Sequence, residues 1–147
     1  MGLGADIFIG SLLPTSTLRA ATARAFSVPI DRVVYREIGE SPWPDADVVL
    51  DYFDETIPGD YPLQLLPWVP DDRLETIGTA LAVMAHDLGA PILTSADSDD
   101  PMDMELYLPD GTMHIVSVDQ DEDGGIRNSP VMRALIDRAT PSVAIAS

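Results

Sequence analysis

The sequence predicts an α+β fold, in which two main helices pack on one face of a mostly antiparallel sheet and form a single pair of layers with it. The first observation is the order of patterns along the chain, in which short β-rich segments outnumber segments of helical periodicity. The second is the stretch from residue 32 to residue 69, which holds three β-rich segments with no helical pattern between them. A doubly wound parallel sheet alternates strands with helices, so this stretch argues against one.

The N-terminal part of the chain begins with a strand and a helix. Residues 5–10 are rich in β-forming side chains and end at a glycine, which predicts a short strand. Pro14 and the Thr15-Ser16-Thr17 that follows supply helix-start chemistry, and apolar residues then share one helical face for about ten residues. Pro29 disfavours helical geometry at the residue before it, so we expect the helix to end there.

Three strands are predicted between the two main helices. Residues 32–38 and 47–54 are both rich in β-forming side chains. Residues 61–69 form the third candidate, and this segment contains Pro62 and Pro67. A proline has no N–H to donate to a neighbouring strand, so we expect the third strand at an edge of the sheet.

A second main helix is predicted over residues 72–88, and a short last helix over residues 130–139. Asp72 and Glu75 have the spacing of a capping box at the start of the second helix, and Gly89 supplies its C-terminal stop. Its apolar positions recur at helical spacing: Leu74, Ile77, Leu81, Met84 and Leu88. For the last helix, the inward-facing residues are expected to be Val131 and Leu135, with Ala134 as a further candidate.

The C-terminal half also contains three predicted strands. Residues 91–95 form a short one, and residues 102–108 and 112–119 form the two arms of a hairpin. The turn between the arms is Pro109-Asp110-Gly111, a strong hairpin signal. The second arm offers three candidate core residues: Met113, Ile115 and Val118.

The 147 residues are enough to bury one core without disulfides or metals, so we expect a single globular domain over residues 1–147. The chain has no cysteine, which excludes a disulfide scaffold, a thiol nucleophile and cysteine-ligated zinc. No apolar run approaches the roughly 20 residues that span a bilayer, and the N-terminus has no secretion pattern. We therefore expect a cytoplasmic protein without a membrane partner.

The chain is strongly acidic. Twenty-five acidic residues against eight basic ones give a formal net charge of −17, and all eight basic residues are arginines. This balance disfavours binding to nucleic acid phosphates or to anionic lipids. It fits a basic protein partner, or no charged partner at all.

The acidic residues concentrate in two loops that flank the predicted hairpin. Residues 74–126 hold twelve acidic residues and no basic one. The two loops join the same end of an antiparallel pair, so we expect one negative patch there. Its residues are Asp97, Asp99, Asp100, Asp103, Asp119, Asp121, Glu122 and Asp123. Such a patch would steer a cationic partner, with Trp43 in its Pro-rich loop as a candidate anchor; the alternatives are a merely solvated acidic surface, and a Trp43 that caps the core.

A metal-binding alternative rests on the segment from Asp119 to Ile126. It matches the first eight positions of a calcium loop, D-x-D-x-D-G-x-I, in which carboxylates at alternate positions converge on one cation. The candidate ligands are Asp119, Asp121 and Asp123, with Asp97, Asp99 or Asp103 completing the shell. Position twelve is Pro130 instead of the bidentate Glu, and the alternative reading is an acidic hairpin exit.

Catalysis finds little support in the sequence, and no cofactor motif occurs. Asp51 and Glu37 are carboxylates within apolar strands, where burial would raise the pKa of a general acid; the alternative is an outward-facing or arginine-paired residue. His86 is expected to face solvent from the second helix, and His114 to lie on the outer face of its strand. An enzyme that uses a strand carboxylate is therefore a third hypothesis, and we expect no catalytic activity.

The order of the predicted segments in the C-terminal half supports a comparison. A predicted helix leads into Leu88-Gly89-Ala90-Pro91-Ile92-Leu93, an acidic Ser95-Ala96-Asp97-Ser98 turn follows, and a predicted hairpin around Leu108-Pro109-Asp110-Gly111 comes before an acidic exit. In this order of segments, over roughly residues 72–127, the chain resembles the small bacterial immunity proteins that neutralise polymorphic or contact-delivered toxins. This resemblance implies a cytoplasmic, non-enzymatic inhibitor that occludes a cognate toxin, often through an acidic face. The leading hypothesis is therefore an acidic, immunity-like binding protein.

Overall fold

The structure is a computed structural model that describes residues 2–3, 6–40, 43–53, 57–96, 99–100 and 102–139. None of the described helices is long and apolar enough to cross a membrane. The helices are α1 (Thr15–Phe26), α2 (Ile77–Leu88) and α3 (Pro130–Ala139), with short 3-10 turns η1 (Ile30–Arg32) and η2 (Asp71–Thr76). The strands are β1 (Gly2–Leu3), β2 (Ile7–Ile9), β3 (Val33–Glu37), β4 (Val48–Tyr52), β5 (Leu63–Val69), β6 (Ile92–Ser95), β7 (Asp103–Tyr107), β8 (Met113–Ser117), β9 (Asp119–Gln120) and β10 (Ile126–Arg127).

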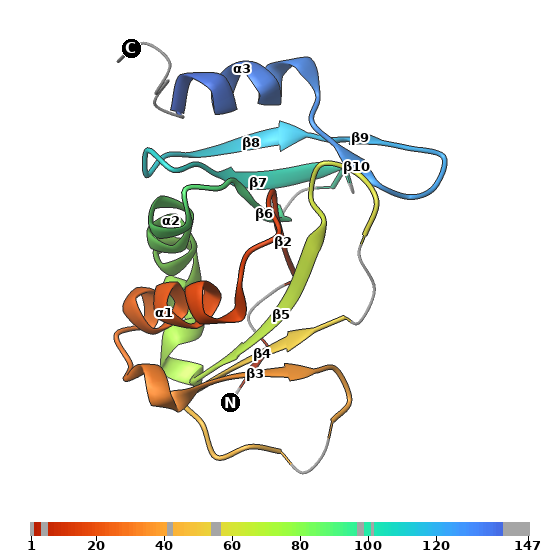
Figure 1. The fold of residues 1–147 in the computed structure, drawn as a ribbon. Helices are drawn as coiled ribbons and strands as arrows, with labels where there is room; N and C mark the ends of the chain where they lie inside the picture. Colours follow the sequence, from red (N-terminus) through yellow and green to blue (C-terminus); the bar gives the residue numbers. More distant parts are fainter. Residues whose placement is uncertain are drawn as a thin grey trace.

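The main sheet has the strand order β3-β4-β5-β2-β6-β7-β8, with β1 paired to β5 beside β2 (Figure 1). Its pairs are antiparallel except for β3 and β4, which run parallel. A separate hairpin of β9 and β10 follows β8. The predicted α+β class and mostly antiparallel sheet are confirmed.

Helices α1 and α2 pack on one face of the sheet, as predicted (Figure 1). Between them and the strands lies the larger core, which includes Leu18, Leu81, Met84, Ile7 and Leu50. Because side chains alternate along a strand, the neighbours of these strand residues point to the opposite face.

The smaller helix α3 lies over the opposite face, at the β6–β8 end of the sheet (Figure 1). Met132 of α3 is fully buried in a second core with Leu93, Leu106 and Val116. The predictions that Val131 and Ala134 face inward are wrong. Val131 is 66% exposed and Ala134 is exposed as well, because the turn of the helix places Met132 inward instead. The other predicted residue of α3, Leu135, packs against the second core.

Strand β5 lies in the interior of the sheet, so the expected edge position is wrong. It pairs with β4 on one side, and with β2 and β1 on the other. Residues 63–65 face β2 and residues 68–69 face β1. Pro67 falls between these two stretches, where its missing N–H interrupts neither ladder, and Pro62 precedes the strand.

Helix α2 does not begin with the predicted capping box. A 3-10 turn occupies residues 71–76, and no side chain caps the start of the α-helix at Ile77. Pro70 initiates this turn, because its carbonyl accepts the N–H of Arg73 at 2.8 Å. The predicted stop is confirmed: Gly89 has φ +63° and donates to the carbonyls of Ala85 and His86.

Strands β7 and β8 form the predicted hairpin, but two of its three candidate core residues are exposed. Val118 is buried, whereas Met113 is 45% and Ile115 56% exposed. Met113 lies opposite Tyr107, so both share the face that α2 covers. Helix α2 reaches Tyr107 on β7, and β8 lies one strand further toward the edge, beyond that cover.

Candidate functional site

The β7–β8 hairpin brings together the points at which the two acidic loops join its strands. Asp103 lies directly opposite Ser117, and the N–H of Val118 donates to the carbonyl of Met102 at 3.2 Å. The chain thus enters β7 from one acidic loop and leaves β8 into the other at the same place, as the hairpin prediction requires.

Several carboxylates at this end of the hairpin are exposed. We refer to five of them as the acidic end: Asp99, Asp100, Asp119, Glu122 and Asp123. Within the described ranges, Asp99, Asp119 and Glu122 form no ion pair with an arginine. Asp97, which the sequence also predicts for the patch, lies outside the described residues.

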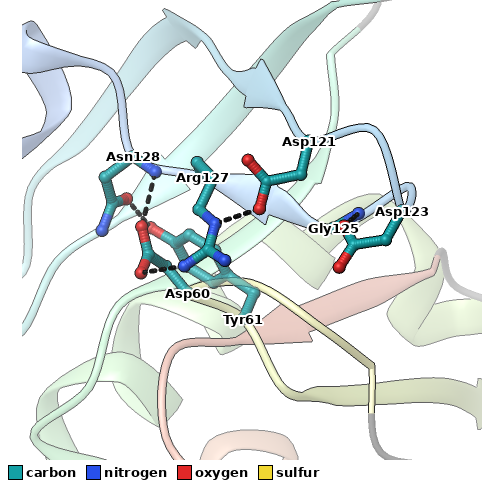
Figure 2. Close-up of polar contacts among 7 residues, drawn as sticks. All are labelled: Asp60, Tyr61, Asp121, Asp123, Gly125, Arg127 and Asn128. Carbon is teal, nitrogen blue, oxygen red and sulfur yellow. Dashed lines mark hydrogen bonds and ion pairs between the residues drawn. The ribbon is translucent and has the colours of Figure 1, made fainter.

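Two predicted patch residues are used inside the fold instead. Asp121 accepts a hydrogen bond from Nε of Arg127, and the same guanidinium approaches Asp60 at 3.6 Å (Figure 2). Asp103 accepts a hydrogen bond from the hydroxyl of Ser117 at 2.9 Å. The charge of Asp121 is therefore balanced by that of Arg127, and neither Asp121 nor Asp103 is counted in the acidic end.

The acidic segment after β8 is a tight hairpin turn. The N–H of Gly124 donates to the backbone carbonyl of Asp121 at 3.0 Å, and the N–H of Asp121 donates to the backbone carbonyl of Gly125 at 2.9 Å. Gly124 has φ +84°, and the carboxylate of Asp123 accepts the N–H of Gly125 at 3.1 Å. The Glu122-Asp123-Gly124 loop is thus a three-residue connection closed by a left-handed glycine.

The turn between β7 and β8 has the same construction. Gly111 has φ +88°, and the carboxylate of Asp110 accepts the N–H of Thr112 at 3.0 Å. The hydroxyl of Thr112 donates to the same carboxylate at 2.6 Å, and these bonds hold the pKa of Asp110 below its usual value. Asp-Gly at the same place in both loops shows that this pair is hairpin chemistry here.

This construction accounts for the calcium-like spacing without a cation. The carboxylate of Asp121 turns to Arg127, that of Asp123 turns to the Gly125 amide, and Asp119 is exposed. In the part of the chain that the structure describes, no three His, Asp or Glu side chains converge as a metal site requires. The arrangement of the described side chains thus gives the metal-binding alternative no support.

The β9–β10 hairpin is tied to the loop before β5 (Figure 2). The N–H of Asp60 donates to the carbonyl of Ile126 at 2.8 Å, and the carboxylate of Asp60 accepts the N–H of Asn128 at 2.9 Å. The hydroxyl of Tyr61 donates to the side chain of Asn128 at 2.6 Å. Burial raises the pKa of Tyr61 far above its usual value, so this hydroxyl keeps its proton.

Local sequence patterns do not indicate this tie, because its members lie far apart along the chain. The sequence signal for it is a glycine at each of two contacting positions, Gly59 and Gly125. A Cβ on Gly59 would meet the backbone of Ile126, and a Cβ on Gly125 would lie 2.6 Å from the carbonyl oxygen of Pro58. The two segments approach backbone to backbone, which requires glycine on both sides.

Trp43 lies at the other end of the sheet, against a buried ion pair. Arg36 on β3 donates from Nε to the carboxylate of Asp51 on β4 at 2.6 Å, and the indole of Trp68 on β5 donates to it at 2.9 Å. The ring of Trp43 covers the guanidinium at 4.1 Å and meets Trp68 edge to face.

This position separates Trp43 from the acidic end. Four strand spacings of about 4.8 Å each lie between β5 and β8. The structure therefore does not bring Trp43 together with the other predicted partner-binding residues, although its ring is 46% exposed.

The strand carboxylates do not form a recognisable active site. Asp51 is buried and bonded to Arg36 and Trp68, and Glu37 is exposed. A cavity of about 350 Å³ lies elsewhere, against α1 and the end of α2. Its lining consists of Ser16, Thr17, Ala20, Ala21, Arg24 and Asp87. A second, of about 300 Å³, is lined by Thr15, Arg19, Asp31, Val33, Val34 and Tyr35.

The two histidines contact the same turn, between β7 and β8, from different elements: His86 from α2, and His114 from β8, with Nε2 3.0 Å from the hydroxyl oxygen of Thr112. His86 is exposed, as expected, with Nδ1 2.8 Å from the carbonyl oxygen of Pro109. His114 is half-buried and shares the face of Leu106 and Val116, so its expected position on the outer face is wrong. Strand alternation explains this, because the exposed side chains of β8 belong to the neighbouring positions.

Comparison of the chain with protein-family models, with curated proteins and with solved structures finds no significant match. The resemblance of the C-terminal half to bacterial immunity proteins stays a prediction. The acidic end at the base of the β7–β8 hairpin is the candidate site that the geometry favours.

Proposed function

We propose that this protein is a non-catalytic, cytoplasmic inhibitor of the immunity type, which binds a basic protein and occludes its functional surface. The observation that carries the proposal is the acidic end, where the hairpin gathers exposed carboxylates from two loops. The segment that supplies them, residues 74–126, contains no basic residue. A positively charged protein surface is the partner that complements it.

Electrostatics favours binding over fold stability as the role of these carboxylates. Like charges held together repel and destabilise a compact chain, and a net charge of −17 adds to that cost. The fold uses Asp121 and Asp103 for internal bonds but leaves Asp99, Asp119 and Glu122 without an arginine partner within the described ranges. Complementary charge of this kind raises association rates by roughly tenfold to a thousandfold.

The part of the acidic end that the β9–β10 hairpin carries is also held in place. The β9–β10 hairpin that presents Glu122 and Asp123 is fixed to the loop before β5 by Asp60 and Tyr61 (Figure 2). A fixed set of charges loses less conformational entropy on binding than a mobile one, which favours affinity.

The test is affinity capture from the lysate of the native host with three baits. One is the wild-type chain, one carries Asp99→Arg, Asp119→Arg and Glu122→Arg, and the control carries Glu37→Arg, Asp72→Arg and Glu75→Arg. The three control residues are exposed and lie outside the acidic end, so both variants change the net charge equally.

We expect one basic protein on the wild-type and control baits at about 50 mM salt, with at least about tenfold less on the acidic-end variant. Its retention on all baits should fall at about 500 mM salt. Equal retention of that protein by both variants would refute the acidic end as the binding surface. Circular dichroism of each bait checks that all three are folded.

A further inference from the structure

Strand β8 is an edge of the main sheet and pairs only with β7 among the described residues. The N–H of Leu108 donates to the carbonyl of Thr112 at 2.9 Å, and the N–H of Val118 donates to Met102 at 3.2 Å. Hydrogen-bonded pairs alternate along an antiparallel ladder, so residues 112, 114, 116 and 118 face β7 with their backbone groups. The N–H and C=O groups of Met113, Ile115 and Ser117 therefore point away from the sheet.

The same three residues expose their side chains. Met113 is 45% exposed, Ile115 is 56% exposed, and Ser117 is exposed as well. Together they make a strip of backbone donors and acceptors that no other described strand pairs with, beside two apolar side chains. We call Met113, Ile115 and Ser117 the open edge.

The open edge lacks the usual protection of an edge strand. Proteins block such edges with charges or prolines, yet residues 113–117 contain neither, in a chain with twenty-five acidic residues. The opposite edge, β3, differs. It carries Arg36 and Glu37, and the carbonyl of Val33 accepts a hydrogen bond from Nε of Arg19 at 3.0 Å.

We propose that the open edge accepts an extended segment of the basic partner as an added β-strand. This inference rests on the proposed function and specifies how its partner docks. The segment pairs its backbone with residues 113, 115 and 117, and covers Met113 and Ile115 with apolar side chains at alternate positions. Its basic residues face the acidic end. Asp119, a member of the acidic end, lies two residues after Ser117.

Charge decides between this occupant and a second copy of the chain. Two antiparallel β8 strands paired about Ile115 would bring the Asp119–Asp123 turn of one copy toward Asp110 of the other. Each copy also carries a net charge of −17, so the two would repel. A cationic segment meets the same groups with the opposite sign.

The test uses two synthetic peptides of alternating lysine and valine that differ only in backbone chemistry. One has free amides, and the other is N-methylated at alternate residues, which removes the hydrogen bonds of one strand edge but keeps the charge. Binding is measured by fluorescence anisotropy at about 50 mM salt. Hydrogen exchange then reports the amides of residues 113, 115 and 117.

Strand addition predicts that the free-amide peptide binds at least about tenfold more tightly than the methylated one, because several outward hydrogen bonds are lost together. It also predicts slower exchange at Met113, Ile115 and Ser117 in the complex. Ile115→Pro, which removes an outward N–H and leaves the ladder to β7 intact, should weaken binding about tenfold. Ile115→Thr keeps that N–H and should weaken it by no more than about threefold.

Each other outcome separates this inference from the proposed function. Equal binding of both peptides, lost in the Asp99→Arg, Asp119→Arg, Glu122→Arg variant, would overturn strand addition and leave electrostatic recognition standing. No binding of either peptide would overturn strand addition, while the lysate capture decides the function on its own. Self-association in sedimentation that Ile115→Pro abolishes would identify a second copy as the occupant and overturn the proposal. Thermal melting of each variant establishes that it is folded.

Discussion

The pairing of Asp51 with Arg36 is a buried ion pair between two neighbouring strands of the sheet. Asp51 is 2% exposed and lies opposite Arg36 in the parallel register of β3 and β4. The pair therefore links β3 to β4 through side chains, in addition to the backbone ladder between the two strands. The indole of Trp68 satisfies the second carboxylate oxygen, and Trp43 shields the guanidinium from water.

We expect Asp51→Asn to lower the free energy of unfolding by about 3–5 kcal/mol, because it leaves the buried guanidinium of Arg36 without its counter-charge. The double variant Arg36→Met with Asp51→Leu removes both charges and should recover much of that loss. Urea denaturation at neutral pH measures both. A single variant within about 1 kcal/mol of wild type would show that water reaches the guanidinium and that the pair contributes little.

At the scale of elements, local patterns predicted α1, α3 and the strands β2 to β8 close to the bounds that the structure shows, but placed the start of α2 at residue 72 instead of Ile77 and did not predict the short strands β1, β9 and β10. Apolar periodicity and the residues that end helices or form turns depend on nearby positions in the chain. Gly89 at the end of α2 and the Pro109-Asp110-Gly111 turn are examples. The position of each strand in the sheet is set by distant segments, and so Pro67 misled the placement of β5. The same limit explains Asp121, whose partner Arg127 turned an apparent calcium ligand into part of a hairpin tie.

The tie between the loop before β5 and the β9–β10 hairpin makes a test at this scale. Gly59 has φ +104°, and a Cβ there would meet the backbone of Ile126, with the amide nitrogen at 2.8 Å. We expect Gly59→Ala to destabilise the fold by about 1–3 kcal/mol more than Gly39→Ala. Gly39 has φ +83° with open space around it, so it isolates the backbone cost alone.

Thermal and urea unfolding of the two glycine variants supply the comparison, and hydrogen exchange at Asn128 shows whether the tie has opened. Equal losses of stability would mean that the close approach of the two backbones adds nothing to the cost of a left-handed alanine.

Across the whole molecule, charge is unevenly distributed along the chain. The arginines lie before residue 74 or after residue 126, and the stretch between them, which forms α2 and β6–β9, has none. Hydrogen bonds and packing among these elements must offset the repulsion among the acidic side chains of residues 74–126. The exposed carboxylates give the β8 end of the sheet a negative electrostatic potential. This potential would attract a basic partner over a distance.

Salt should therefore act in opposite directions on folding and on binding. Raising the salt from about 10 mM to about 500 mM screens repulsion among the exposed carboxylates, so we expect the melting temperature to rise by several degrees. The Asp99→Arg, Asp119→Arg, Glu122→Arg variant has less repulsion at the acidic end and should gain less, starting from a higher value at low salt. The same salt should weaken capture of the proposed basic partner, because it would screen attraction between the two molecules. Differential scanning fluorimetry measures the first effect, and a melting temperature that falls with salt in the wild type would show that repulsion among these carboxylates does not limit the stability of the fold.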